Sequence, residues 1–260
     1  MYGLGVNRLG VTNVRGGFNP LSLFANGEQG SWYDPSDLSS MKQISDGTVN
    51  AAVDSPVGYI EDKSGNGNTA IQATSVKRPT LRESGGLYYL EFSGAQGLRT
   101  TSNINFTGTD TMSAFLGVKK DNDSTTSLIE LSSTIGSGSG KFRFSTTING
   151  LYRWSSRGDV LSNANSTVNA PTTNVLTAQS EISEDLNILR IDGVQTASST
   201  SNQGVGNYSS DALNIGARNN ALSLHLTGRI YSIIIRNVLS SDTEINSTEA
   251  YVASKTGVSL

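Results

Sequence analysis

The stretch that decides the fold is Lys141-Phe-Arg-Phe-Ser-Thr146, followed by Asn149-Gly150 and Leu151-Tyr-Arg-Trp154. Polar and apolar residues alternate strictly in its first part, which places Phe142 and Phe144 on one face of a β-strand. The Asn-Gly pair supplies the two positive φ angles of a type I′ turn. The stretch therefore predicts a β-hairpin with one apolar face.

The same two-residue period continues in both directions along the chain. A second hairpin is predicted where Asn187–Ile191 and Val194–Thr196 flank the pair Asp192-Gly193. Further strands are predicted at Leu87–Phe92, Met112–Lys119, Ser127–Leu131, Val175–Ile182, Ala212–Ile215 and Gly228–Arg236. The last of these is apolar on both faces, with Tyr231, Ile233 and Ile235 on one and Ile230 and Ile234 on the other. We therefore expect it to be buried on both sides.

One helix is predicted near the C-terminus, over Ser241–Thr256. Ser241-Asp-Thr-Glu244 fits a capping box, and Gly257 can end the helix in the left-handed conformation. Many strands with a single short helix predict an all-β protein. The expected architecture is a two-sheet antiparallel jelly-roll sandwich over residues 31–260.

The composition excludes several classes of protein. The 260 residues include 28 Gly and carry a net charge of −3, with only 16% charged residues. This balance argues against a basic nucleic-acid binder. The chain has no Cys, which excludes a disulfide framework, a thiolate zinc site and a cysteine nucleophile. Its one histidine, His225, lies between Leu224 and Leu226 on a predicted strand and is expected to be structural.

The first thirty residues differ from the rest of the chain. They are rich in Gly, and their apolar residues follow no sustained period. They also lack the continuous apolar run of a signal peptide. No apolar run approaches membrane-spanning length, so we expect no membrane insertion. We predict that residues 1–30 form an extended docking arm rather than a domain. Its expected apolar anchors are Leu4, Val6, Phe18, Leu23 and Phe24.

Several blocks of the sequence resemble a known family. They are Gly27–Leu38, Val57–Asn68, Arg78-Pro79, Tyr89–Gly94 with Leu98, Asn187–Gly193, Ile215-Gly216, Gly228–Arg236 and Glu249–Gly257. Together they resemble the concanavalin A-like (laminin-G-like) jelly-roll proteins of tailed bacteriophages and prophages, over roughly residues 27–260. The resemblance implies a jelly roll on a virion component, often with a role in carbohydrate recognition.

A loop rich in small and amide residues, Asp62-Lys-Ser-Gly-Asn-Gly-Asn68, follows one of these blocks. The Asp62 carboxylate and the amides of Asn66 and Asn68 are hard oxygen donors of the kind that calcium binds. The alternative is an Asx-turn, in which Asp62 accepts hydrogen bonds from backbone amides of the loop. Both interpretations are open at this point, and no other cofactor is expected.

The carboxylates do not form the pattern of a glycoside hydrolase. Such enzymes need two carboxylates about 5–10 Å apart across the scissile bond. Glu181, Glu184 and Asp185 form the nearest cluster, at an expected strand end, whereas Glu91 and Glu130 are isolated and expected to be solvated. We therefore predict that the protein is not an enzyme, with a polysaccharide-degrading enzyme as the less favoured alternative.

Sugar binding needs aromatic rings and planar polar groups on accessible loops. Residues of these types cluster after the first hairpin turn and in a Gly/Ser-rich loop, and the candidates are Tyr152, Arg153, Trp154, Arg157 and Tyr208. The alternative for Trp154 is a place in the core.

These observations predict a structural protein on the surface of a tailed-phage virion that displays a lectin-like jelly roll. It is expected as a head decoration, a fibre or a tail-associated adhesin, with host-surface carbohydrate as its ligand. The expected partners are other virion subunits, bound through the arm, and further copies of the chain. The alternative is a glycan-binding module encoded by a prophage and not carried on the virion.

Overall fold

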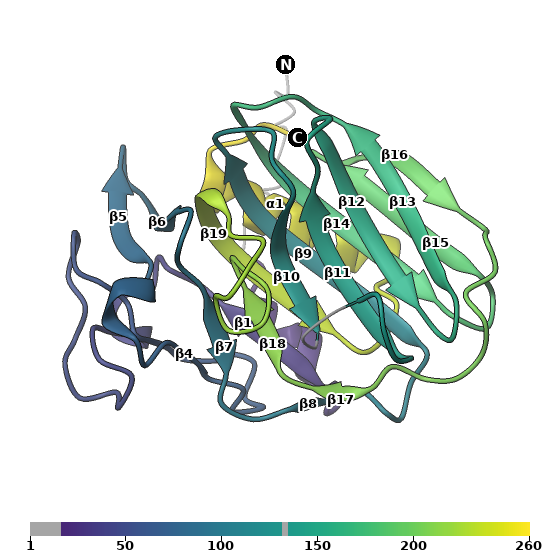
Figure 1. Ribbon diagram of the computed structural model, residues 1–260, viewed down its shortest axis with the longest axis horizontal. Helices are drawn as coiled ribbons and strands as arrows, with labels where there is room; N and C mark the ends of the chain where they lie inside the picture. The colour runs from purple at the N-terminus through teal and green to yellow at the C-terminus, as the bar shows by residue number, and fades with distance from the viewer. Residues whose placement is uncertain (1–16, 132–134) are drawn as a thin grey trace, which may run out of the picture.

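Two antiparallel sheets pack face to face in the computed structural model, which describes residues 17–131 and 135–260 (Figure 1). The eight-stranded sheet has the order β16 (Val194–Ser199), β15 (Leu186–Ile191), β14 (Thr172–Glu181), β9 (Thr111–Lys120), β19 (Thr227–Arg236), β6 (Leu87–Ser93) and β5 (Thr80–Ser84), and β1 (Gly30–Tyr33) also pairs with β19.

The nine-stranded sheet lies in front of it in Figure 1. Its order is β13 (Leu161–Thr167), β12 (Leu151–Arg157), β11 (Lys141–Thr146), β10 (Thr126–Leu131), β18 (Leu213–Ile215), β7 (Leu98–Thr100), β4 (Ala70–Ile71), β3 (Tyr59–Ile60) and β2 (Met41–Lys42). The remaining elements are the pair β8 (Ile104–Asn105) and β17 (Ser210–Asp211), the 3₁₀ turns η1 (Pro20–Phe24), η2 (Leu38–Ser40) and η3 (Ser75–Lys77), and the helix α1 (Asp242–Thr256). The predicted all-β sandwich with a short C-terminal helix is confirmed.

The first predicted hairpin is present, but its turn differs from the prediction. β11 and β12 pair in register from Lys141–Arg157 to Thr146–Tyr152. Of the Asn-Gly pair only Gly150 has a positive φ, and its N–H donates to the carbonyl of Thr147. The connection is therefore a longer loop built on an ordinary turn. In the second hairpin both Asp192 and Gly193 have positive φ, as a type I′ turn requires.

β19 is buried on both sides, as predicted, but its faces are partly exchanged. A bulge shifts its register against β9 between Ile230 and Ser232. Ile230, Ile233 and Ile235 therefore join the core between the sheets, whereas Tyr231 packs on Tyr89 instead. An extra residue at a bulge reverses the inside–outside alternation beyond it, and no local sequence pattern predicts this bulge.

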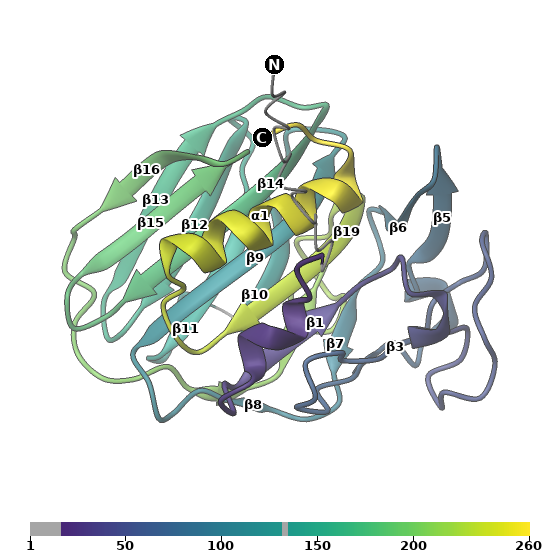
Figure 2. The same ribbon diagram turned by 180° about the vertical axis from the view of Figure 1, so that it is seen from behind.

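α1 covers the outer face of the eight-stranded sheet (Figure 2). Ser241 caps it through the predicted capping box, and Gly257 ends it at φ 75°. A second apolar core fills the space below the helix, formed by Leu23, Phe24, Trp32, Phe115, Val175, Ile234, Ile245, Val252 and Ala253. Gly117 of β9 allows the close approach, since a Cβ there would lie 2.6 Å from Thr256 Cγ2.

The predicted docking arm is wrong over its second half. Leu23 and Phe24 are buried in the second core, and Phe18 packs against the ring of Tyr251. The domain therefore includes the chain from residue 17 onward. The apolar side chains of η1 share one core with those of α1 and shield them from water. The other two expected anchors, Leu4 and Val6, lie outside the described residues.

Two leucines of η1 provide a matched test of this packing. Leu23 is 1% exposed and Leu21 is 47% exposed. We expect Leu23→Ala to lower the free energy of unfolding by about 2–5 kcal/mol, because it leaves a cavity below α1, and Leu21→Ala by less than about 0.5 kcal/mol. Urea unfolding followed by fluorescence measures both. Equal effects would show that η1 contributes nothing to the core.

Candidate functional site

The outer face of the nine-stranded sheet faces the viewer in Figure 1, and no helix of the described residues lies on it. Register pairs run straight across it: Asn163–Ser155, Ser155–Arg143, Arg143–Glu130, Glu130–Asn214, Asn214–Arg99, Arg99–Ile71 and Ile71–Tyr59. Paired residues of neighbouring strands point to the same side of a sheet. One continuous row, mostly of polar side chains, therefore crosses the sheet; we call its surroundings the open face.

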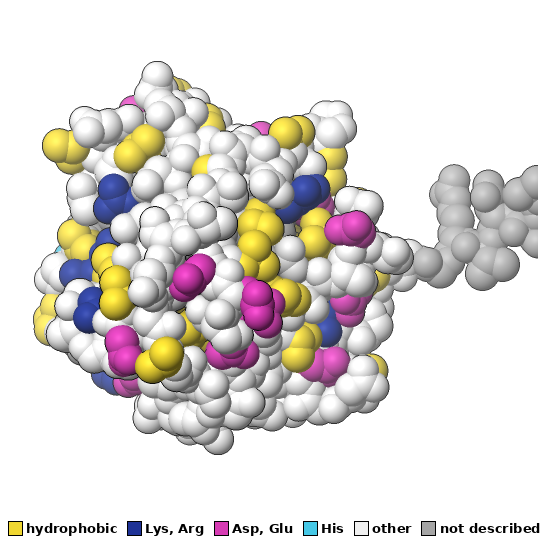
Figure 3. All heavy atoms as spheres, turned by 90° about the vertical axis from the view of Figure 1, so that its right-hand side faces the viewer, with side chains coloured by type: hydrophobic (Ala, Val, Ile, Leu, Met, Phe, Trp, Pro, Cys, Tyr) yellow, Lys and Arg dark blue, Asp and Glu magenta, His cyan; other side chains and the backbone are white. Residues whose placement is uncertain are grey.

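The open face is positively charged. Lys141, Arg143, Arg153, Arg157 and Arg99 belong to its strands by register, and Arg218 reaches it from the loop after β18. Of these, Lys141 pairs with Asp211 and Arg218 with Glu130. Within the described part of the chain, no ion pair is formed by the other four. Figure 3, seen from the right of Figure 1, shows Lys and Arg gathered along the left border, which is the side of the open face.

Glu130 lies at the centre of the row and is wholly buried, contrary to the expected solvated charge. Its carboxylate accepts two hydrogen bonds from Arg218, at 2.8 and 3.0 Å, one from the backbone N–H of Ile135 at 2.6 Å and one from Ser127 Oγ at 3.3 Å. Both oxygens are thus occupied. Glu130 positions Arg218 and is not free to act as an acid or a base.

The loop that carries Arg218 has an unusual backbone. Asn219, Asn220 and Ala221 are consecutive non-glycine residues with φ between 52° and 57°, a conformation that costs most residues free energy. The N–H of Asn220 donates to Asn214 Oδ1 at 2.8 Å, which ties the loop to the row. His225 lies further along the same loop, so its predicted position on a strand is wrong.

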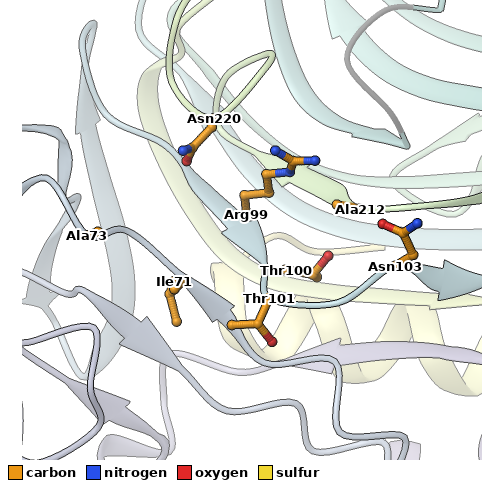
Figure 4. A pocket seen from close by; sticks show the side chains of 8 residues that line it. All are labelled: Ile71, Ala73, Arg99, Thr100, Thr101, Asn103, Ala212 and Asn220. Atoms are coloured by element: carbon orange, nitrogen blue, oxygen red, sulfur yellow. The ribbon is translucent and has the colours of Figure 1, made fainter.

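A pocket of about 310 Å³ opens beside this loop (Figure 4). It is lined by Ile71, Ala73, Arg99, Thr100, Thr101, Asn103, Ala212 and Asn220. Figure 4 shows the side chains of Arg99, Thr101, Asn103 and Asn220 projecting from β7 and the adjoining loops. Hydroxyl, amide and guanidinium groups of this kind can donate to and accept from a polar ligand.

The predicted sugar-binding residues separate into two groups. Arg153 and Arg157 lie on the open face, where Arg153 Nε donates to Asn165 Oδ1 at 2.7 Å and an Arg157 amino group to the carbonyl of Gly136 at 3.2 Å. Tyr152, Trp154 and Tyr208 are buried between the sheets, and their prediction as exposed platforms is wrong. The physical reason is the strand period, because Tyr152 and Trp154 pair with Thr146 and Phe144 on the inner side of β11.

The buried rings have partners inside the core. Trp154 Nε1 donates to Ser180 Oγ at 2.6 Å, and the Tyr208 hydroxyl is hydrogen-bonded to Ser156 Oγ at 2.6 Å. Burial raises the pKa of both Tyr152 and Tyr208 above the ordinary value of a phenol. These side chains hold the two sheets together and cannot contact a ligand.

The candidate calcium loop is an Asx-turn. Asp62 Oδ1 accepts from the N–H groups of Trp32 and Ser64, and Oδ2 from the N–H of Asn68 and the hydroxyl of Ser64, all at 2.9 Å. The amides of Asn66 and Asn68 donate to the carbonyl of Gly30. Four donors occupy the carboxylate and the amides face a backbone carbonyl, so the calcium prediction does not fit the geometry; instead the loop fixes the start of β1.

The carboxylates predicted as an alternative catalytic cluster lie at the end of β14. Burial raises the pKa of Glu181, and the charges of Asp110 and Glu184 raise it further. Asp185 occupies a turn at φ 53° and accepts a hydrogen bond from the N–H of Gln203. The pockets on the open face, beside Phe18 and beside Tyr88 have no described Asp or Glu in their linings.

Comparisons with known proteins bear on the fold. No protein-family model matches the sequence, and a comparison with curated proteins gives no match. A GH54 α-L-arabinofuranosidase superposes with a TM-score of 0.64 at 12% identity, over 92% of this chain and 66% of its own. The Trypanosoma rangeli sialidase superposes with a TM-score of 0.54 at 13% identity, over 84% of this chain and 32% of its own. The botulinum neurotoxin serotype G binding domain superposes with a TM-score of 0.56 at 13% identity, over 75% of this chain and 49% of its own.

The chain thus spans from about a third to two thirds of the lengths of these structures. At such identities the likeness establishes the sandwich fold. Two of the three are enzymes by name and one is a binding domain, so the fold is shared by both classes of protein. The described residues also contain no helix with the length and hydrophobicity that crossing a bilayer requires.

Asp62 provides a test of the Asx-turn. We expect Asp62→Ala to lower the free energy of unfolding by ~3 kcal/mol or more, since three backbone N–H groups lose their acceptor. Calcium or a chelator should leave the melting temperature of the unaltered protein unchanged. A calcium-dependent rise in melting temperature that Asp62→Ala abolishes would restore the metal site.

Trp154 and Arg153 provide a test of the two faces. Trp154 is 0% exposed, so Trp154→Ala should cost about 3–5 kcal/mol of unfolding free energy. Arg153→Ala, one residue away on the open face, should cost less than about 1 kcal/mol. Thermal and urea unfolding measure both. A small loss of unfolding free energy in Trp154→Ala would show that the ring is not part of the core and would restore its prediction as a sugar-binding residue.

Proposed function

We propose that this chain is a lectin-like surface protein of a tailed-bacteriophage particle, which binds host-surface carbohydrate through the open face and catalyses no reaction. The observation that carries the proposal is the row of polar side chains across a sheet left uncovered by any helix. The particle and its phage origin rest on the resemblance of the sequence blocks and on nothing in the geometry.

Carbohydrate suits the chemistry of the open face. Sugars present many hydroxyl groups that both donate and accept, and they are recognised by planar polar side chains held in fixed positions. Asn163, Arg153 and Asn220 are of this kind, and strand pairing or backbone hydrogen bonds hold them in place. The pocket of about 310 Å³ is at the lower end of the range for small-ligand sites.

The carboxylates support binding rather than hydrolysis. Glycoside cleavage needs an acid and a second carboxylate on opposite sides of one bond. On the open face Glu130 is enclosed by four hydrogen bonds, and the pocket lining holds no Asp or Glu. Glu181 with its raised pKa is the observation that favours the second candidate, a polysaccharide-degrading enzyme.

Attachment to the particle belongs to the same proposal. Residues 1–16, with Leu4 and Val6, are proposed to bind other subunits or sister copies, because the rest of the predicted arm is engaged in the domain itself. A glycan-binding module that is not carried on a particle is the alternative. Mass spectrometry of purified phage particles separates the two, since the alternative requires the chain to be missing from them.

Glycan binding by the pocket can be measured directly. We expect the purified protein to bind at least one host-surface polysaccharide on an array, and Arg99→Ala to weaken that binding by roughly threefold to tenfold. Arg82→Ala, which removes the same charge from β5 outside the open face, should leave it unchanged.

Two results would contradict the proposal. One is a failure to bind any polysaccharide at millimolar concentration of sites. The other is release of reducing ends by the protein, lost in Glu181→Gln, which would establish the enzyme instead.

A further inference from the structure

Arg143 is a buried cation without a partner. It stands at the centre of the row on the open face, is only 9% exposed, and forms no hydrogen bond or ion pair with any described residue. Its Nε is wholly buried and unsatisfied. Taking a guanidinium group out of water without pairing it is costly, and native structures rarely retain such a group without a reason.

Two further polar atoms share this condition on the same face. Ser145 Oγ, two residues along β11, and Arg157 Nε, on the neighbouring β12, are both buried and without a partner. Register pairs Ser145 with Arg153 and Lys141 with Arg157, so all these side chains lie on one side of a two-strand segment. Three buried atoms of this segment that can donate a hydrogen bond therefore lack an acceptor among the described residues.

No residue within 17–131 or 135–260 supplies that acceptor. Glu130, the register partner of Arg143, is the nearest carboxylate in the row, but Arg218, Ile135 and Ser127 occupy its oxygens. The charged groups that act on Arg143 are Glu130, which has the largest effect of the three, and the cations Arg218 and Arg153. Burial also lowers the pKa of Arg143, because desolvation disfavours its charged form.

We propose that Arg143, together with Ser145 and Arg153, binds the carboxylate of an acidic sugar, so that the glycan taken by the open face is a polyanion. This inference rests on the proposed function and names the class of its ligand. A guanidinium group meets a carboxylate through two parallel charge-assisted hydrogen bonds, which are stronger than those to a neutral hydroxyl. The pocket at Arg99 lies further along the same row and can hold another sugar residue of the same glycan.

The experiment compares acidic oligosaccharides with their carboxyl-reduced, neutral counterparts. The probes are tetramers of galacturonate, of sialate and of hyaluronan, each measured by calorimetry against the full chain. We expect at least one acidic tetramer to bind roughly tenfold or more tightly than its reduced form, and its affinity to fall as salt is raised. Arg143→Gln should remove most of that difference, and Ser145→Ala a smaller part. Arg82→Gln, with the same change in net charge, should remove none.

The melting temperature without ligand supplies the second readout. An unpaired buried arginine whose role is ligand binding destabilises the ligand-free protein. The Arg143→Gln variant should therefore melt at or above the melting temperature of the unaltered chain. A clear fall in melting temperature with unchanged affinity would show a structural role and overturn the inference. Equal binding of acidic and reduced tetramers would overturn it as well while leaving the proposed function intact. Binding of neither form would remove the proposed function itself.

Discussion

The packing of Trp154 against Phe142 and Phe144 is the contact on which the open face depends. The Trp154 ring stacks on Phe142 at 5.5 Å between centroids and lies 4.8 Å from Phe144, and its Nε1 reaches across to Ser180 on the other sheet. These contacts fix which side of β11 and β12 points inward. The alternate residues of the same strands, Arg143 and Arg153, must then point outward. Core packing thus sets the chemistry of the surface, and no separate device is needed to aim the arginines.

The eight-stranded sheet shows the opposite solution on its outer face. There α1 is held by polar as well as apolar contacts, since Arg190 makes two hydrogen bonds to the buried Glu249 and Tyr251 donates to Asp34. The cation Arg190 thus has its anion on this side of the molecule. On the open face, by contrast, Arg143 forms no hydrogen bond or ion pair with a described residue.

Sequence patterns predicted many of the secondary-structure elements, but they did not predict which side chains contact one another in the folded protein. Period-two patterns and the capping box located α1 and most of the longer strands to within a few residues, because these signals are local, but β5 and β13 were missed. The same alternation that placed Phe142 and Phe144 inside also implies that Trp154 lies inside once it is paired with Phe144. The predicted two-residue turn would instead have paired Trp154 with Ser145, and a register shift of one residue reverses the face of every side chain. Glu130 and Arg143 lie on the consecutive strands β10 and β11, but Arg99 on β7 and Arg218 in the loop after β18 join them from distant parts of the sequence. No local pattern predicts such a row, nor the bulge that turns Tyr231 away from the core.

The path of the N-terminal segment bears on how the domain is oriented when it is held by that end. Phe18 lies against Tyr251 on the helix side, and η1 and β1 continue along that side (Figure 2). The described chain therefore starts at the back of the molecule, and the arginine row is at the front. A support that grips the preceding residues would hold every copy with its arginines facing away from the support. Neighbouring copies would then offer parallel rows to one long polymer, and contacts too weak to last singly would add up along it.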